Sequence, residues 1–302
     1  MAGIAYVEGR FMPVEEARMP ILDLGFLRGD AVYDTISVWK GNFFRLDDHL
    51  ARFQASCRSM RLLLPMPVEE LKRILAECVA RAGVEQAGYV QMILTRGKFV
   101  SPANRDLRLC SHNFMCYSLP YVWIASPERQ EQGLHLAIVE NRRTPTEAMD
   151  PTVKNFNSMD MQRGLLQAYD HEADYALLLT PDGYLSEGPG YNLFFVKDRM
   201  LHSPKRNVLE GITRRSVADL AAELGLECRF ADLEPAQLRG ADEAFLTSTA
   251  GGIMPVTVVD GRTLGNGAPG ILTGQIRARY WQKREAGWLG TPVASLVAAK
   301  VA

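Results

Sequence analysis

Apolar and polar positions in the first part of the chain predict a strand hairpin followed by two helices. Residues 31–39 alternate in polarity, and the Lys-Gly-Asn turn signal at 40–42 allows residues 43–45 to return as the partner strand. Apolar residues then recur at spacings of three and four over 46–60, and again over 68–79 behind a proline. This spacing is typical of amphipathic helices.

Further along, apolar runs bounded by turn residues predict more strands, and helical spacing predicts more helices. Val217, Leu220, Ala221 and Leu224 form an apolar stripe closed by Gly225, a natural left-handed residue at a helix end. The other expected elements are strands over 89–95, 113–119, 175–180, 191–196, 243–247 and 256–259, a polar loop over 97–111, and helices over 159–171 and 271–281.

Strands and helices intermix without regular strand-helix alternation, so the pattern favours an α+β (mixed α/β) fold over a doubly wound sheet. A length of 302 residues is typical of two domains. We expect a small N-terminal α/β domain over 1–119, a connector over 120–131, and a larger C-terminal domain over 132–302.

Composition argues against a membrane protein, an exported protein and a nucleic-acid-binding protein. The chain is 47% hydrophobic and 23% charged, as in soluble globular proteins, and no apolar run approaches the roughly 18 residues that a bilayer requires. Glu8 and Arg10 interrupt the apolar stretch that a signal peptide would need, so we expect a cytoplasmic protein. The 34 basic and 35 acidic residues form no like-charged block, which argues against nucleic acid or a membrane surface as partner.

Several familiar motifs are absent or lack their context. The five cysteines include no CxxC pair, and the five histidines lack ligand spacing, so we expect neither a disulfide framework nor a metal. Residues 265–270 match GxGxxG literally, but they follow a turn and contain a proline, which is not the strand-to-helix context of a dinucleotide-binding loop. No GxSxG elbow or phosphate-binding P-loop occurs.

Four features of the second half fit one chemistry. Lys154 lies in an otherwise uncharged segment, where a desolvated amine can act as a nucleophile, although a lone lysine is more often a surface charge. Glu187 lies among small residues between two apolar strands, and would otherwise be a solvated turn residue. Residues 211–213 open a helix and residues 247–252 end a strand in hydroxyls and glycines. Both segments could bind phosphate. Otherwise, residues 211–213 are an ordinary helix cap and residues 247–252 a simple turn.

A Schiff-base lysine, an acid for a pyridinium nitrogen and a phosphate cradle are what a pyridoxal phosphate enzyme requires. The chain resembles the fold type IV, or class IV, pyridoxal-phosphate-dependent aminotransferases, which include D-amino acid and branched-chain aminotransferases. The resemblance extends over nearly the whole chain. It is carried, in the family's order, by RLDDHLARF (45–53), TRG (95–97), VKNF (153–156), LSEGPGYNLF (185–194), GITRRSV (211–217) and TSTAGG (247–252).

The resemblance implies a two-domain fold of the D-amino acid aminotransferase type, a homodimer, and a role for each matching residue. Lys154 matches the lysine that binds the cofactor covalently, and Glu187 matches the partner of the pyridine nitrogen. The residues implied to hold the phosphate are Arg52, Ile212, Thr213, Ser248 and Thr249. Helical spacing places His49, Arg52 and Ser56 on one polar line, although Arg52 alone would be read as solvated.

Three stretches, 143–160, 120–124 and 248–261, look most like the (R)-selective amine transaminases of this group. This likeness implies transfer of an amino group from a primary amine or amino acid to an oxo acid such as pyruvate, in two half-reactions at one site. GDAVYDT (29–35) is similar to D-amino acid aminotransferases, and a D-amino acid or branched-chain amino acid aminotransferase is the alternative.

Substrate-facing positions depart from both patterns. Arg28 replaces an expected histidine and Ser158 an expected aromatic residue, whereas Tyr33 matches an active-site tyrosine and Arg105 lies in a loop that can carry a carboxylate-binding arginine. Tyr33 and Arg105 also have ordinary readings, as a core aromatic and a surface charge.

Two rival functions use the same residues differently. A lyase of the aminodeoxychorismate lyase type would share Lys154 and Glu187 but would release product without an amino acceptor. A non-catalytic protein would use the pocket without covalent attachment of the cofactor, and the presence of both Lys154 and Glu187 disfavours it.

Overall fold

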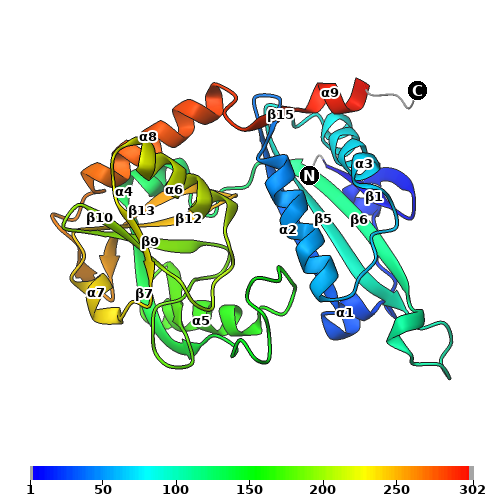
Figure 1. Ribbon diagram of the computed structural model, residues 1–302, viewed down its shortest axis with the longest axis horizontal. Helices are drawn as coiled ribbons and strands as arrows, with labels where there is room; N and C mark the ends of the chain where they lie inside the picture. Colours follow the sequence, from blue (N-terminus) through cyan, green and yellow to red (C-terminus); the bar gives the residue numbers. More distant parts are fainter. Residues whose placement is uncertain (1–2, 299–302) are drawn as a thin grey trace. The chain divides into compact units, whose positions relative to one another are not determined.

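The computed structural model describes residues 3–298, which divide into two compact units (Figure 1). Of the described residues, the first unit contains 3–122, the segment Val153–Asn157 and 284–298. The second unit contains Trp123–Thr152 and Ser158–Lys283. These units differ from the continuous domains expected above, because the segment with Lys154 belongs to the first unit rather than to a C-terminal domain.

The first unit is built on a seven-stranded antiparallel sheet with the order β15-β4-β3-β5-β6-β1-β2. Its strands are β1 (Ile4–Val7), β2 (Arg10–Pro13), β3 (Ala31–Trp39), β4 (Asn42–Phe44), β5 (Ala87–Lys98), β6 (Ser111–Pro120) and β15 (Gly290–Pro292). Its helices are α1 (Leu24–Arg28), α2 (Leu46–Ser59), α3 (Val68–Ala82) and α9 (Val293–Ala298), with 3₁₀ turns η1 (Val14–Glu16) and η2 (Leu107–Leu109).

Helices α2 and α3 pack on this sheet and form the core of the first unit with it (Figure 1). Phe53 of α2 and Leu71 and Leu75 of α3 are completely buried, as is Ile36 of β3. These positions belong to the apolar faces that the sequence predicts, so burial of the two helical stripes accounts for how the helices dock.

The second unit contains a mixed sheet with the order β11-β10-β9-β12-β13-β7-β8, and β14 pairs with β13. Its strands are β7 (Leu134–Arg142), β8 (Tyr175–Leu179), β9 (Asn192–Lys197), β10 (Met200–Pro204), β11 (Cys228–Ala231), β12 (Glu243–Ser248), β13 (Gly252–Val259) and β14 (Arg262–Thr263). The helices are α4 (Pro127–Gln132), α5 (Met159–Asp170), α6 (Ile212–Glu223), α7 (Pro235–Arg239) and α8 (Ile271–Glu285), whose last two residues belong to the first unit.

Both faces of this second sheet are covered. Leu136 and Leu177 pack in one cluster, whereas their neighbours Ala137 and Leu178 pack in another that includes Ala168 of α5. Successive side chains of a strand point to opposite faces, so the strands at this end of the sheet are buried on both sides. This explains why β8 has the continuous apolar sequence YALLL.

The structure confirms the mixed helix-and-strand fold class and the main expected elements. Gly225 is left-handed, with φ of +68°, as expected, but Leu224 is 39% exposed and lies outside the buried stripe. The expected connector 120–131 contains the start of α4, and the expected loop 97–111 contains η2. Sequence patterns missed β1, β2, β7, β10, β11, β14 and β15, all of which except β7 are five residues or shorter.

Within residues 3–298, no helix is both long enough and apolar enough to cross a bilayer.

Candidate active site

Lys154 lies in an irregular segment that hydrogen bonds attach to β3 and α2. The Lys154 carbonyl accepts a hydrogen bond of 3.0 Å from the Tyr33 amide, and the Lys154 amide donates one of 3.1 Å to Ser56 Oγ. Val32 and Asn155 form an isolated antiparallel bridge. Because the backbone is held on both sides, the first unit positions this lysine even though α5 of the second unit follows it in sequence.

The Lys154 amine lies against an aromatic pair. Lys154 Nζ is 3.4 Å from Tyr33 Oη and 4.4 Å from the centre of the Tyr33 ring. The ring of Phe156 stacks on Tyr33 with centroids 4.5 Å apart and planes inclined by 30°. We call Tyr33, Lys154 and Phe156 the lysine cluster; it places a nucleophilic amine within reach of a phenol that can exchange a hydrogen bond with it.

A buried carboxylate, Asp34, orients Arg52. Arg52 Nε donates to Asp34 Oδ2 and Arg52 Nη2 to Oδ1, each at 2.8 Å, and His49 Nδ1 lies 2.8 Å from Oδ1. Burial opposes ionisation of Asp34, but Arg52 and His49 outweigh it, so the pKa of Asp34 lies well below its usual range. The expected polar line of His49, Arg52 and Ser56 therefore faces the protein interior.

His49 is held neutral in this arrangement. Burial lowers its pKa below the usual 6.5, and the nearby positive charges of Arg52 and Lys154 act in the same direction, whereas Asp34 opposes them. A neutral imidazole bonded to Asp34 through Nδ1 adds no positive charge beside Arg52.

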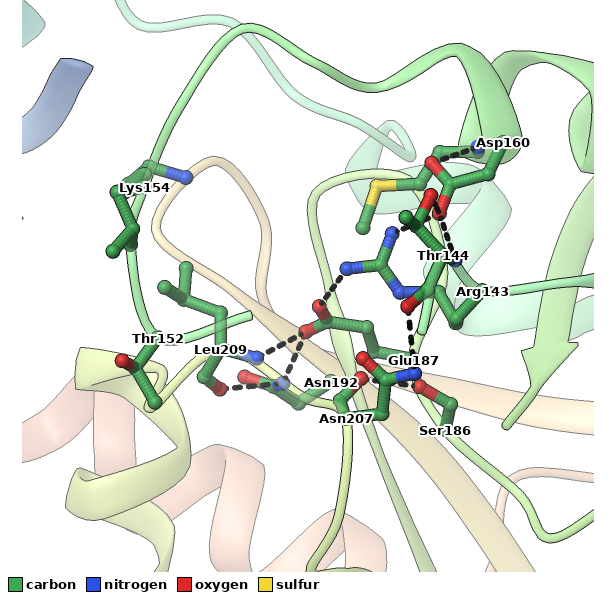
Figure 2. A network of polar contacts seen from close by, with 12 residues as sticks. Arg143, Thr144, Thr152, Lys154, Asp160, Ser186, Glu187, Asn192, Asn207 and Leu209 are labelled. Atoms are coloured by element: carbon green, nitrogen blue, oxygen red, sulfur yellow. Dashed lines mark hydrogen bonds and ion pairs between the residues drawn. The ribbon is translucent and has the colours of Figure 1, made fainter. Parts of the chain in front are cut away.

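Glu187 of the second unit is 4% exposed and its carboxylate is surrounded by donors (Figure 2). Glu187 Oε2 accepts hydrogen bonds of 2.9 Å from Asn192 Nδ2 and from the Leu209 amide. Glu187 Oε1 lies 3.3 Å from Arg143 Nη2. Donors on two sides suit an ionised carboxylate, which is the form that can accept a hydrogen bond from a protonated ring nitrogen.

Asn192 connects Glu187 to both candidate phosphate segments. A Cβ on Gly211, the residue before α6, would lie 2.0 Å from Asn192 Oδ1, so only glycine fits at this approach. Asn192 on β9 also pairs with Thr247 on β12, and Ser248 and Thr249 follow directly. The second unit thereby brings Glu187, residues 211–213 and residues 247–249 together.

The first turn of α6 suits an anion. Gly211 provides no side-chain cap, the turn contains no acidic residue, and Ile212 and Thr213 are both 3% exposed. Orphan N–H groups and the positive end of the helix dipole at such a turn favour phosphate. Ser248 Oγ accepts a 3.2 Å hydrogen bond from the Ala250 amide, and Thr249 is half-buried.

The remaining substrate candidates lie at the surface of their own units. Arg28 ends α1 and is exposed, and Arg105 is exposed in the loop after β5, where its guanidinium lies 5.5 Å from the centre of the Phe99 ring. Ser158 is half-buried at the residue before α5 and makes no side-chain cap there. Among the described residues of the first unit, neither Arg28 nor Arg105 makes a hydrogen bond, ion pair or ring contact with the lysine cluster.

Sequence reasoning missed Asp34, Asn192 and Arg143. Asp34 lies in GDAVYDT and Asn192 in LSEGPGYNLF, so both were inside motifs already singled out. Their positions within these motifs do not show which side chains they bind. Arg143 is 44 residues from Glu187 in sequence, and no local pattern connects them.

The residues present fit pyridoxal phosphate. The first unit offers a primary amine for the aldehyde, and the second offers an ionisable buried carboxylate for the pyridine nitrogen and an uncapped helix start for the phosphate. The Thr247 hydroxyl is buried with no hydrogen-bond partner among the described residues, which further indicates a polar site that the folded chain leaves incomplete.

Comparisons with known proteins agree with a pyridoxal phosphate site. A family profile described as amino-transferase class IV matches residues 31–259. A Methanocaldococcus jannaschii protein provisionally named a branched-chain-amino-acid aminotransferase is 32% identical over 278 residues, covering 91% of this chain and 94% of the relative. A D-alanine aminotransferase of Bacillus licheniformis is 31% identical over 272 residues, covering 89% and 93%.

Among solved structures, a branched-chain amino acid aminotransferase with pyridoxamine 5'-phosphate superimposes with a TM-score of 0.89 at 30% identity, covering 97% of this chain and 99% of that one. The branched-chain aminotransferase of Thermoproteus uzoniensis with norvaline gives a TM-score of 0.86 at 28% identity, covering 96% and 99%. The family match spans most of the chain and the fold matches nearly all of it. This chain therefore belongs to the class IV aminotransferases and is a pyridoxal-phosphate-dependent enzyme.

Proposed function

We propose that Lys154 binds the cofactor and that the enzyme moves an amino group between an amino acid with an apolar side chain and an oxo acid. The observation that carries this proposal is the lysine cluster, in which the Lys154 amine lies 3.4 Å from the Tyr33 hydroxyl. When bound, pyridoxal phosphate supplies a pyridine ring that accepts electrons from the reacting carbon. Lys154 then moves the proton of that carbon, and Tyr33 orients the amine.

The other roles carry over from the family resemblance. Glu187 keeps a proton at the ring nitrogen, and its buried, donor-rich surroundings support this role because they stabilise the ionised carboxylate. Arg52, Ile212, Thr213, Ser248 and Thr249 hold the phosphate. Orientation of Arg52 by Asp34 supports its part, since a guanidinium fixed on one side presents a defined charge on the other.

The apolar substrate class is supported by Phe156. This side chain is 41% exposed, although its ring stacks on Tyr33 beside the amine. An exposed aromatic face next to the nucleophile suits a branched or aromatic substituent, which would gain roughly 25 cal/mol for each Å² of apolar surface buried there. Relatives named for branched-chain amino acids and D-alanine point to amino acids as the donors.

An (R)-amine transaminase is the second candidate, and the position of Arg105 favours it. Such an enzyme accepts an uncharged donor and then a carboxylate at the same place, which a fixed buried charge cannot do. Arg105 is held by the face of Phe99, a contact that contributes only about 0.5–1 kcal/mol at an exposed site, so the guanidinium can move.

The lysine assignment is tested by borohydride reduction of the holoenzyme followed by peptide mapping. The pyridoxyl group should appear on Lys154, and the Lys154→Ala variant should lose both the label and turnover. A label on another lysine would overturn the assignment. A reaction that proceeds without an amino acceptor would instead support the lyase.

The substrate class is tested by a donor screen with pyruvate, using L-leucine, D-alanine and both enantiomers of an aryl alkyl amine. Phe156→Ala should lower kcat/KM for leucine about tenfold and for alanine much less, because only the larger side chain covers the ring. Tyr169→Ala, which removes a 54% exposed aromatic ring from α5, is the matched control. Equal losses for both donors would refute the role of Phe156.

The carboxylate contact is tested separately by stopped-flow measurement of the two half-reactions. Arg105→Ala should raise the apparent KM for the oxo acid and spare an uncharged amine. Equal effects on both would indicate a structural role for Arg105. If Arg105→Ala affects neither half-reaction, Arg28 becomes the candidate for the carboxylate contact. Ser158→Ala then tests whether the other departing position contacts the substrate.

We also propose a homodimer. Five large apolar side chains within nine residues of the first unit are exposed: Met19, Ile21, Leu22, Phe26 and Leu27. Apolar groups gathered in this way are typical of a face covered by another protein. Sedimentation should give twice the chain mass, and Phe26→Glu should shift the equilibrium toward monomer, whereas a wild-type monomer at micromolar concentration would refute the dimer.

A further inference from the structure

Arg143 bridges two carboxylates in the second unit (Figure 2). It follows β7, and its side chain is only 11% exposed. Arg143 Nη1 donates to Asp160 Oδ2 at 2.7 Å, and Arg143 Nη2 lies 3.3 Å from Glu187 Oε1. The guanidinium therefore divides its charge between the two acids, and its shorter contact is with Asp160.

Asp160 is held firmly in place. Its Oδ2 accepts a 3.0 Å hydrogen bond from the Thr144 amide, and its Oδ1 accepts one of 2.8 Å from the Met161 amide. It lies in the first turn of α5, where the helix dipole favours a negative charge. Its side chain is 11% exposed, so this carboxylate is a fixed and largely dehydrated counter-charge for Arg143.

The three groups together carry one net negative charge. Glu187, Arg143 and Asp160 are all 11% exposed or less at the side chain, so this charge is largely removed from water. Charge in such surroundings is unfavourable unless it is balanced. Arg214, which interacts electrostatically with Glu187, supplies part of the balancing positive charge, and a protonated ring nitrogen on Glu187 would supply more.

We propose that Arg143 and Asp160 are positioning residues that set how strongly Glu187 holds the proton of the cofactor's ring nitrogen. The positive charge of Arg143 partly neutralises the Glu187 carboxylate and so lowers the proton affinity of the ring nitrogen. The Asp160 carboxylate pairs with the same guanidinium and so reduces this effect. The inference rests on the proposed role of Glu187, and it predicts effects of opposite sign from two neighbours in one network.

The test measures the pH at which the ring nitrogen loses its proton, by ¹⁵N NMR of holoenzyme loaded with ¹⁵N-labelled pyridoxal phosphate. Arg143→Met should raise this pH by about one unit, because a charge within roughly 6 Å of a carboxylate has been removed. Asp160→Asn should lower it by about one unit, since Arg143 then acts on Glu187 alone. The double variant should return close to the wild-type value.

A purely structural role predicts a different result. If the two residues only support the fold, both single variants should lower the deprotonation pH and the double variant should lower it most; this result, or no shift in either, would overturn the proposal. Arg143→Lys keeps the charge and should stay near wild type. If Arg143→Met does not fold, Arg143→Gln is used in its place as the variant without the charge.

Two matched controls and one reference variant separate the possible failures. Arg142→Met removes the adjacent exposed arginine and Asp170→Asn an exposed carboxylate of α5, and neither should shift the signal. Melting of each apoenzyme reports folding independently of the cofactor. If Glu187→Gln leaves the ring nitrogen unchanged, the role of Glu187 itself is wrong. If Glu187→Gln shifts the signal but the Arg143 and Asp160 variants do not, only this further inference is wrong.

Discussion

Replacing Asp34 by asparagine removes the negative charge around which Arg52 and His49 are arranged. Asp34 is completely buried and accepts hydrogen bonds of 2.8 Å from both of these side chains and from the Thr35 amide. Asparagine has nearly the same size, so the packing of β3 against α2 is kept. The substitution therefore isolates an electrostatic effect.

The magnitude follows from the burial of Arg52. Removing one partner of a buried ion pair costs about 3–5 kcal/mol, because the other charge remains buried without compensation. The Arg52 side chain is 11% exposed and has a further interaction besides those with Asp34, so we expect the lower end, about 3 kcal/mol. Because the pKa of Asp34 is lowered, its stabilising effect is complete above about pH 4, the unfolded value, and is lost as the pH falls through the folded value.

The assay is urea unfolding of the apoenzyme at pH 7.5, where no phosphate can compensate for Arg52. Asp47→Asn is the matched control, because Asp47 also pairs with a basic residue, Lys72, but its side chain is 80% exposed and the loss should be small. Asp34→Asn combined with Arg52→Met, which removes both charges, should be less destabilised than the sum of the single variants. Equal losses for Asp34→Asn and Asp47→Asn would refute the reasoning.

Three further predictions follow from single positions. Gly97→Ala should destabilise the enzyme by about 2 kcal/mol or more in thermal unfolding, because φ is +72° and a Cβ would lie 1.7 Å from the Ser111 carbonyl oxygen; an unchanged melting temperature would contradict this. Gly211→Ala should weaken cofactor binding at least tenfold by displacing Asn192, and unaltered affinity in a fluorescence titration would contradict it. The pKa of His49 is lowered in the folded state, so its contribution is present above pH 6.5 and lost below it; His49→Gln should flatten the stability profile between pH 6.5 and 5.

The controls for these variants lie elsewhere in the chain. Gly274 is in α8 with open space at its Cβ position and no positive φ, so Gly274→Ala should be neutral or slightly stabilising. His171 lies exposed at the end of α5, so His171→Gln is the control for replacing a histidine outside the core. A slope that changes equally in both histidine variants would show that burial of His49 is not the cause.

The sequence by itself determined the local elements and the chemical groups of the enzyme. The hairpin of β3 and β4 and the helices α2 and α3 follow from polarity patterns, because a strand repeats every two residues and a helix every 3.6. Lys154 and Glu187 stand out because each lies in a segment whose other residues are uncharged or small. The family motifs around them established the cofactor class.

The tertiary structure alone decided which groups act on one another. It assigned the Lys154 segment to the first unit, placed Asp34 against Arg52, and set Arg143 between Glu187 and Asp160. These partners are separated by 17 to 121 residues. Periodicity reports which face of an element is buried, but it carries no information on which distant side chain meets that face. Pairing of buried charges depends on how strands and helices pack, and that is settled only when the whole unit folds.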